Sequence, residues 1–384
     1  MTEQDNFGVR IALIQAFLHK SNCDGVLLSR ADNFAMATGG KRNYVSVGTD
    51  IGAASLFVTK DGAAYFVGNN IEEPRVMEEE LAGLGCEAKS FLWFDGNSAQ
   101  RVRQEFSGHL VSDDGSLGEN VHDKLAYLRV LLTPLELDKY RRLGALAADA
   151  MMAVLDSIQR GDAEADIAAR LAYEGAKRRC LLPVRLVAAD ERIAKYRHPL
   201  PTENRLRGYV MIAAGFQQGG LVVSMTRFKR VGETPAGNDD ALAHIAGVDA
   251  LMQEASRPGR TLGDVFAECQ QAYAQMGFSD NEWHNHHQGG TTGYAGRTCK
   301  ATPGSAFPIL DPQWAKAVKD ITGHDIQFGH AFAWNPSAKG VKSEDTFILL
   351  PDGNTEIVTQ TPVLPQIDLK TVLGRETQVS KSGF

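Results

Sequence analysis

The segment from Gly208 to Arg227, GYVMIAAGFQQGGLVVSMTR, constrains this chain more than any other feature. It contains the longest uninterrupted apolar run of the sequence, Tyr209 to Phe216, which is far shorter than the roughly 20 residues that cross a membrane. Four residues of the segment stand at a fixed spacing: Gly215, Gly220, Thr226 and Arg227. That spacing determines which residue of the chain corresponds to each position of a sequence motif.

The spacing resembles D-x-G-x4-G-x3-D-x-T-R, the core motif of the creatinase, aminopeptidase P, prolidase and methionine aminopeptidase superfamily. In the metallopeptidases of that superfamily both aspartates bind metal, and here these positions are Ala213 and Ser224. A methyl group and an uncharged hydroxyl cannot hold a divalent cation. The resemblance therefore implies the pita-bread fold of the superfamily without its metallopeptidase mechanism.

The other three metal-ligand positions of the resemblance follow further along the chain. The third is Gly290 in HHQGGTTGY, the fourth is Asn335 in WNP, and the fifth is Glu344 in GVKSEDT. Only Glu344 keeps a metal-binding side chain, and one carboxylate among neutral groups does not compete with water for a divalent ion. We expect no metal and no cofactor.

The length of 384 residues predicts two domains. Residues 1–132 read as a small α/β domain of the creatinase and prolidase type, and residues 133–384 as the α+β pita-bread catalytic domain. A formal charge of −7 without a basic block argues against nucleic acid as a partner, and no segment suits a membrane. The polar N-terminus and five scattered cysteines, without a CxxC pair, favour a cytoplasmic protein with reduced thiols.

Local signals predict individual elements. The N-terminal part should contain a helix over Val9–His19, a strand at Gly25–Ser29, a hairpin of Ser55–Thr59 with Ala63–Gly68, and a helix within 69–85. Thr133, Pro134 and Glu136 form a capping box that should open a long helix, and a second helix should follow over 162–178.

His198 is the candidate acid–base residue. It stands in Arg197-His198-Pro199, shortly before the Gly208 segment, where the resemblance places the acid–base histidine of creatinase, an enzyme that hydrolyses a guanidino C–N bond without metal. Imidazole titrates closest to neutral pH, which suits that role. The alternative is an exposed loop histidine without a role in a site.

Glu344 is the second catalytic candidate, because a carboxylate that has lost its metal needs a new partner. The resemblance implies that the matching glutamate of creatinase binds the guanidinium of its substrate. Creatinase has a second substrate-binding glutamate, and the corresponding residue here is Thr226. A guanidinium substrate is therefore doubtful, and a small polar molecule that carries a carboxylate fits better. The substrate-binding candidates are Arg42, Ser224, Thr226, His287, Gly290, Arg297 and Asn335.

The segment SDNEWHNHH offers a different metal site. In an extended chain Glu282, His284 and His286 would share one face. Histidines before a glycine-rich turn more often hydrogen-bond to backbone or substrate, so whether His284, His286 and His287 are catalytic, substrate-binding or structural stays open.

The resemblance to creatinase-like dimers implies a homodimer in which the Arg42 segment, TGGKRNY, reaches the neighbouring subunit's site. The predicted activity is metal-independent hydrolysis of a C–N bond in a small-molecule substrate. A metal-free lyase, isomerase or cyclase that uses the same His198 and Glu344 is the first alternative. A non-catalytic binding protein is the second, and an aminopeptidase with an unrecognised metal the third.

Overall fold

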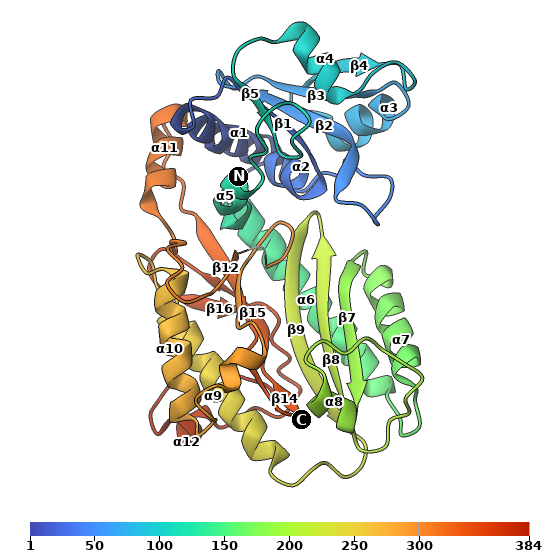
Figure 1. Ribbon diagram of the computed structural model, residues 1–384, viewed down its shortest axis with the longest axis vertical. Helices are drawn as coiled ribbons and strands as arrows, with labels where there is room; N and C mark the ends of the chain where they lie inside the picture. The colour runs from blue at the N-terminus through green and yellow to red at the C-terminus, as the bar shows by residue number, and fades with distance from the viewer. Residues whose placement is uncertain (298, 384) are drawn as a thin grey trace.

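A computed structural model describes residues 1–297 and 299–383, and Figure 1 shows an N-terminal part stacked on a larger C-terminal part. The N-terminal part is built on a five-stranded sheet of order β4-β3-β2-β1-β5. Its strands are β1 (Gly25–Arg30), β2 (Ile51–Thr59), β3 (Ala64–Asn69), β4 (Glu87–Phe91) and β5 (Leu110–Ser112). Its α-helices are α1 (Glu3–Lys20), α2 (Ala31–Thr38), α3 (Glu73–Arg75), α4 (Ser98–Glu105) and α5 (Ala126–Val130).

The hairpin of β2 and β3 is confirmed, with Ala54 opposite Gly68 and Val58 opposite Ala64. The helix expected within 69–85 is confirmed in part, since helical residues run from Glu73 to Glu80. Only the short α3 forms, and a π-helical turn at Val76–Glu80 replaces its continuation. At the end of that turn Glu80 is buried and accepts hydrogen bonds from Arg42.

The first half of the C-terminal part is a three-stranded antiparallel sheet with two helices packed on it (Figure 1). The strands are β7 (Leu181–Ala189), β8 (Tyr209–Gln218) and β9 (Leu221–Arg230), and the helices are α6 (Pro134–Ser157), α7 (Glu164–Lys177) and the short α8 (Glu191–Lys195). The capping box at the start of α6 is confirmed, since Thr133 and Glu136 each cap the other's backbone N–H. In the β8–β9 hairpin Ala213 faces Thr226 and Gly215 faces Ser224.

The second half is a sheet of order β11-β10-β12-β15-β16, in which β6 also pairs with β12. Its strands are β6 (Leu131–Leu132), β10 (Gly289–Thr292), β11 (Cys299–Lys300), β12 (Gly329–Trp334), β15 (Asp345–Leu349) and β16 (Thr355–Ile357). A two-stranded ribbon joins β13 (Ser337–Ala338) and β14 (Val341–Lys342). The helices are α9 (Asn238–Ala255), α10 (Leu262–Gln275), α11 (Pro312–Thr322) and α12 (Leu369–Leu373).

The two halves meet where β9 runs beside β15. The backbone N–H of Thr226 donates to the Glu344 carbonyl at 3.0 Å, and the N–H of Ser224 donates to Thr346 Oγ1 at 2.8 Å. These contacts place the motif that fixes the sequence register directly beside Glu344. None of the helices within 1–297 and 299–383 is long and apolar enough to span a membrane.

The N-terminal part is fastened to the C-terminal part by a fully buried ion pair between Arg10 of α1 and Glu136 of α6. Arg10 also donates to the carbonyls of Leu128 and Leu131, both at 2.9 Å. The Tyr294 hydroxyl donates to Glu136 Oε1 at 2.9 Å. One buried charge pair therefore ties together the first helix, the first helix of the C-terminal part and the glycine-rich segment after β10.

We predict that Arg10→Met destabilises the protein by about 3–5 kcal/mol, because it leaves the Glu136 carboxylate buried without its counter-ion. Urea denaturation measures the free energy of unfolding. The double variant Arg10→Met/Glu136→Leu should recover much of the loss. In the exposed control Arg141→Met, which removes ion pairs to Asp138 and Glu356, the cost should stay below about 1 kcal/mol. An Arg10→Met protein as stable as the wild type would contradict this account of the junction.

Candidate functional site

A cavity of about 680 Å³ opens between the N-terminal part and the β7–β9 sheet. The N-terminal part contributes the end of β1 and the loop before β2, including Arg30, Tyr44 and Asp50. Five of the residues predicted from the sequence line it: His198, Ser224, His287, Arg297 and Glu344. Residues spread over nearly 150 positions of sequence are thus brought to one hollow.

Four other candidates lie outside the cavity lining. The Arg42 guanidinium is paired with Glu80, 2.6 Å from its carboxylate. Thr226 lies behind Glu344 and donates its hydroxyl to that carboxylate at 2.5 Å. Gly290 is enclosed in β10 between β11 and β12. Asn335 is fully buried, and within the described ranges neither polar atom of its side chain has a hydrogen-bond partner.

Glu344 is held as a buried carboxylate by an ion pair with Arg297 and by the hydroxyl of Thr226. Burial opposes its charged form, but Arg297 and then Lys342 favour it more strongly. The net effect lowers the pKa of Glu344 to about 2. At neutral pH the carboxylate is therefore ionised and already neutralised by a guanidinium.

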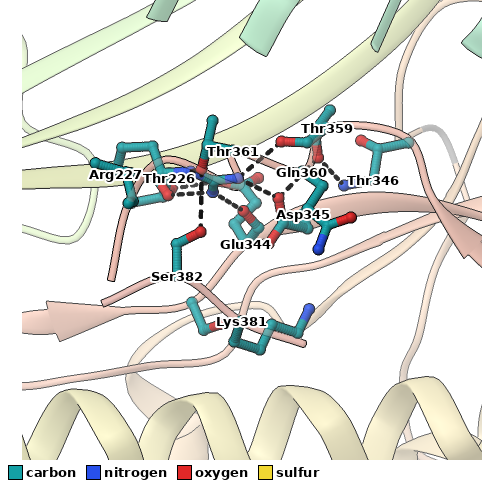
Figure 2. Close-up of polar contacts among 12 residues, drawn as sticks. Thr226, Arg227, Glu344, Asp345, Thr346, Thr359, Gln360, Thr361, Lys381 and Ser382 are labelled. Atoms are coloured by element: carbon teal, nitrogen blue, oxygen red, sulfur yellow. Dashed lines mark hydrogen bonds and ion pairs between the residues drawn. The ribbon is translucent and has the colours of Figure 1, made fainter. Parts of the chain in front are cut away.

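Arg227 makes polar contacts with the residues around Glu344, as Figure 2 shows. Its guanidinium donates to the Thr226 carbonyl at 2.7 Å, and it forms an ion pair with Asp345 at 2.6 Å. It also donates to Thr361 Oγ1 and to the Thr359 carbonyl, both at 2.8 Å. The role of Arg227 is structural, because its contacts fix the strand that carries Glu344.

Three imidazoles meet at one side of the cavity. His286 Nε2 and His198 Nε2 are 2.9 Å apart, so one ring donates a hydrogen bond to the other. The rings of His286 and His287 stack with centroids 4.3 Å apart. Burial, then the charges of Lys342 and Arg297, lower the pKa of His198 below its usual 6.5. Burial followed by Arg297 lowers that of His287 to about 3. The rings are therefore neutral at physiological pH.

The expectation of an extended segment through Glu282, His284 and His286 is wrong. Residues Glu282–Asn285 form a 3-10 turn, because Trp283 packs edge-on against Phe266 of α10. Glu282 then pairs with Arg197 at 2.5 Å. His284 is exposed and lies against Trp283, away from the cluster formed by His198, His286 and His287.

Both the sequence and the fold of this chain are similar to those of known proteins. The model of "Metallopeptidase family M24" matches residues 138–349, more than half of the chain. The chain belongs to family M24. No curated protein matches the sequence.

Solved structures of similar fold cover nearly the whole chain. A dipeptidase from Pyrococcus horikoshii OT3 has a TM-score of 0.71 at 17% identity, over 91% of this chain and 98% of that one. Dipeptidase PepE from Mycobacterium ulcerans has a TM-score of 0.69 at 17% identity, over 94% and 98%. The N-terminal domain of FACT complex subunit SPT16 from chickpea (Cicer arietinum) has a TM-score of 0.64 at 11% identity, over 96% and 99%. These likenesses show the pita-bread fold, and membership of M24 places the chain among hydrolases.

The donor set of this M24 member does not fit the metal centre of the metallopeptidases. Ala213, Ser224 and Gly290 offer no carboxylate or imidazole, and Asn335 offers only an amide. A Cβ atom on Gly290 would collide with the carbonyl oxygen of Cys299 in β11. The neighbouring strand thus occupies the space into which a ligand side chain would extend from this position.

The three histidines form a different donor set. The ligand atoms of His198, His286 and His287 lie within 4.8 Å of one another, a spacing within reach of one ion. Arg297, Lys300 and Lys342, however, all act on His287 to oppose positive charge there. The same repulsion opposes a bound divalent cation, so this cluster suits proton transfer or hydrogen bonding better than metal binding.

Sequence reasoning missed Lys342 and the contact of His286 with His198. Lys342 lines the cavity and is 4% exposed. A sequence signal for it exists, because residues two apart in an extended segment share a face and Lys342 stands two before Glu344. The His198–His286 contact joins residues 88 positions apart and had no local signal.

Glu344 should make stability depend on pH. Its pKa lies below the usual 4.5, so its contribution is fully present above about pH 4.5 and is lost as pH falls toward about 2. We predict that Glu344→Gln lowers the free energy of unfolding at neutral pH by on the order of 3 kcal/mol, and that the difference from wild type shrinks at acid pH. Denaturant titrations at several pH values measure it. The exposed control Glu203→Gln should run parallel to wild type, and a constant offset for Glu344→Gln would contradict the assignment.

Proposed function

We propose that this M24 member hydrolyses a C–N bond of a small polar, carboxylate-bearing molecule without a metal ion. The observation that carries the proposal is His198, an imidazole that is neutral at physiological pH and lines the same cavity as Glu344. A neutral imidazole can take a proton from water, which the family's metal centre would otherwise acidify. Family membership supports hydrolysis, and the donor set supports a reaction that proceeds by side chains alone.

In the proposed reaction His198 removes a proton from water as the water oxygen attacks the carbon of the C–N bond. His198 then returns that proton to the departing nitrogen, so that one water is consumed and an amine is released. The hydrogen bond to His286 fixes the orientation of the His198 ring. Glu344 is ionised and paired with Arg297, and the Glu344 carboxylate orients the substrate. Cytoplasmic localisation and the substrate-binding roles of Arg42, Ser224, Thr226, His287, Gly290, Arg297 and Asn335 belong to the same proposal.

A homodimer is part of the same proposal. Arg42 lies outside its own chain's cavity lining, close to Val45, which also lies outside the lining and is 67% exposed, and to Val47, which is 70% exposed at the edge of the cavity. Exposed apolar side chains of this kind suit burial against a second copy of the chain. A two-fold dimer would let this segment reach the neighbouring subunit, as the sequence suggested.

His198→Ala should lower kcat by about 10²–10⁴-fold with a smaller effect on KM, because the acid–base group is removed while the cavity remains. The exposed His284→Ala is the matched control and should keep wild-type kinetics. Steady-state kinetics on a panel of small N-acyl and amidino carboxylates measures both variants. In the wild type, the acid limb of the kcat/KM profile should lie below the usual imidazole pKa of 6.5, since the pKa of His198 is lowered. A His198→Ala enzyme with wild-type kcat would sink the acid–base assignment.

The wild-type enzyme should keep its activity in EDTA, because the five M24 ligand positions supply a single carboxylate. Elemental analysis of the purified protein should find less than stoichiometric manganese, cobalt, iron and zinc. One or two ions per chain, together with activity lost in EDTA and restored by one of these metals, would show instead that the reaction depends on metal.

A further inference from the structure

Lys342, the last residue of β14, is a buried cation that the proposed reaction does not use. Its side chain lines the cavity beside His198, Arg297 and Glu344, although the residue as a whole is only 4% exposed. Among residues 1–297 and 299–383 its ammonium forms neither a hydrogen bond nor an ion pair. A buried ammonium in such a position is unusual, since lysine is seldom fully buried unless it is paired.

The acids around the cavity already have other partners. Glu344 is paired with Arg297 and accepts a hydrogen bond from Thr226. At the opposite, N-terminal side, Arg30 lies 3.4 Å from Asp32 and 3.1 Å from Asp50. The end of the cavity near the histidines therefore carries an excess of positive charge, from Lys342 and from the exposed Lys300.

This charge excess is costly while the cavity holds only water. Taking an ammonium out of bulk water without a counter-ion costs several kcal/mol. A bound anion would supply the missing counter-ion.

We propose that Lys342 binds the carboxylate of the substrate, the anchor that places its C–N bond beside His198. This inference rests on the proposed function, which puts the substrate in the same cavity. It gives the anchoring role to Lys342 rather than to Arg297 or Arg42, because Glu344 and Glu80 already neutralise those two guanidinium groups. An ammonium with free N–H donors can form charge-assisted hydrogen bonds with one carboxylate oxygen or both.

The substrate class follows from the same charges. A bound monocarboxylate supplies the one negative charge that the Lys342 ammonium needs as a counter-ion. The neutral imidazoles beside the reacting group do not form a binding site for a second anionic group. The structure therefore favours small molecules with one carboxylate close to the C–N bond. Neutral amides of the same shape lack the charge that pairs with the ammonium.

Equilibrium binding tests the anchor without any turnover. The probes are butyrate and N-acetylglycine, each against its neutral amide, butyramide and N-acetylglycinamide, titrated by calorimetry at neutral pH and low salt. Wild-type protein should bind each carboxylate at least about 10-fold more tightly than its amide, as expected when one charged pair is lost. Lys342→Met should abolish that preference, and Lys342→Arg should restore part of it. Lys339→Met, which alters the exposed lysine of the same ribbon, should behave as wild type.

Folding is checked on the same variants. Lys342→Met removes an uncompensated charge, so its midpoint of urea unfolding should equal or exceed that of wild type. Equal binding of carboxylates and amides by wild type, or an unchanged carboxylate preference in Lys342→Met, would overturn the proposal. The hydrolase proposal fails separately: a His198→Ala protein with unchanged kcat would refute it while the carboxylate preference stayed intact.

Discussion

The site depends on how one buried carboxylate is neutralised. Glu344 directly precedes β15, and its buried carboxylate accepts a hydrogen bond from the Thr226 hydroxyl. An ionised carboxylate in such a setting needs a positive partner, and Arg297 supplies it. Because that guanidinium is committed to Glu344, Lys342 is left without a counter-ion among residues 1–297 and 299–383. The charge pattern of the whole cavity follows from this one ion pair.

The contacts that hold this part of the fold come from the chain itself. The segment from Gly215 to Arg227 forms the β8–β9 hairpin through backbone pairing, which does not depend on the side chains of Ala213 and Ser224. Ala213 and Ser224 fit the hairpin without any ion, and at Gly290 the carbonyl of Cys299 takes up the space of a side chain. Stability rests instead on buried polar contacts such as Arg10–Glu136 and Arg227–Asp345, whose partners come from the chain itself.

Much of the fold could be predicted because its signals are local. The capping box at Thr133 and the hairpin of β2 and β3 depend on a few consecutive residues. The π-helical turn at Val76–Glu80 was missed because no local pattern marks it, and the hydrogen bond of Glu80 with Arg42 joins residues 38 positions apart. For the same reason, the sequence placed Glu344 and Arg297 near one site but could not reveal that they pair with each other, or that Lys342 remains unpaired.

In this cavity the positive charge of Lys342 favours the neutral form of the neighbouring histidines. Burial, and after it the charge of Lys342, lowers the pKa of His198, so that this imidazole is able to accept a proton at neutral pH. An anion bound at Lys342 would weaken this effect and raise the proton affinity of His198. Substrate binding would thus strengthen His198 as a base at the moment when water must be deprotonated. A metal centre achieves a similar result by acidifying its bound water, whereas here the charge of the bound substrate would tune the base that deprotonates the attacking water.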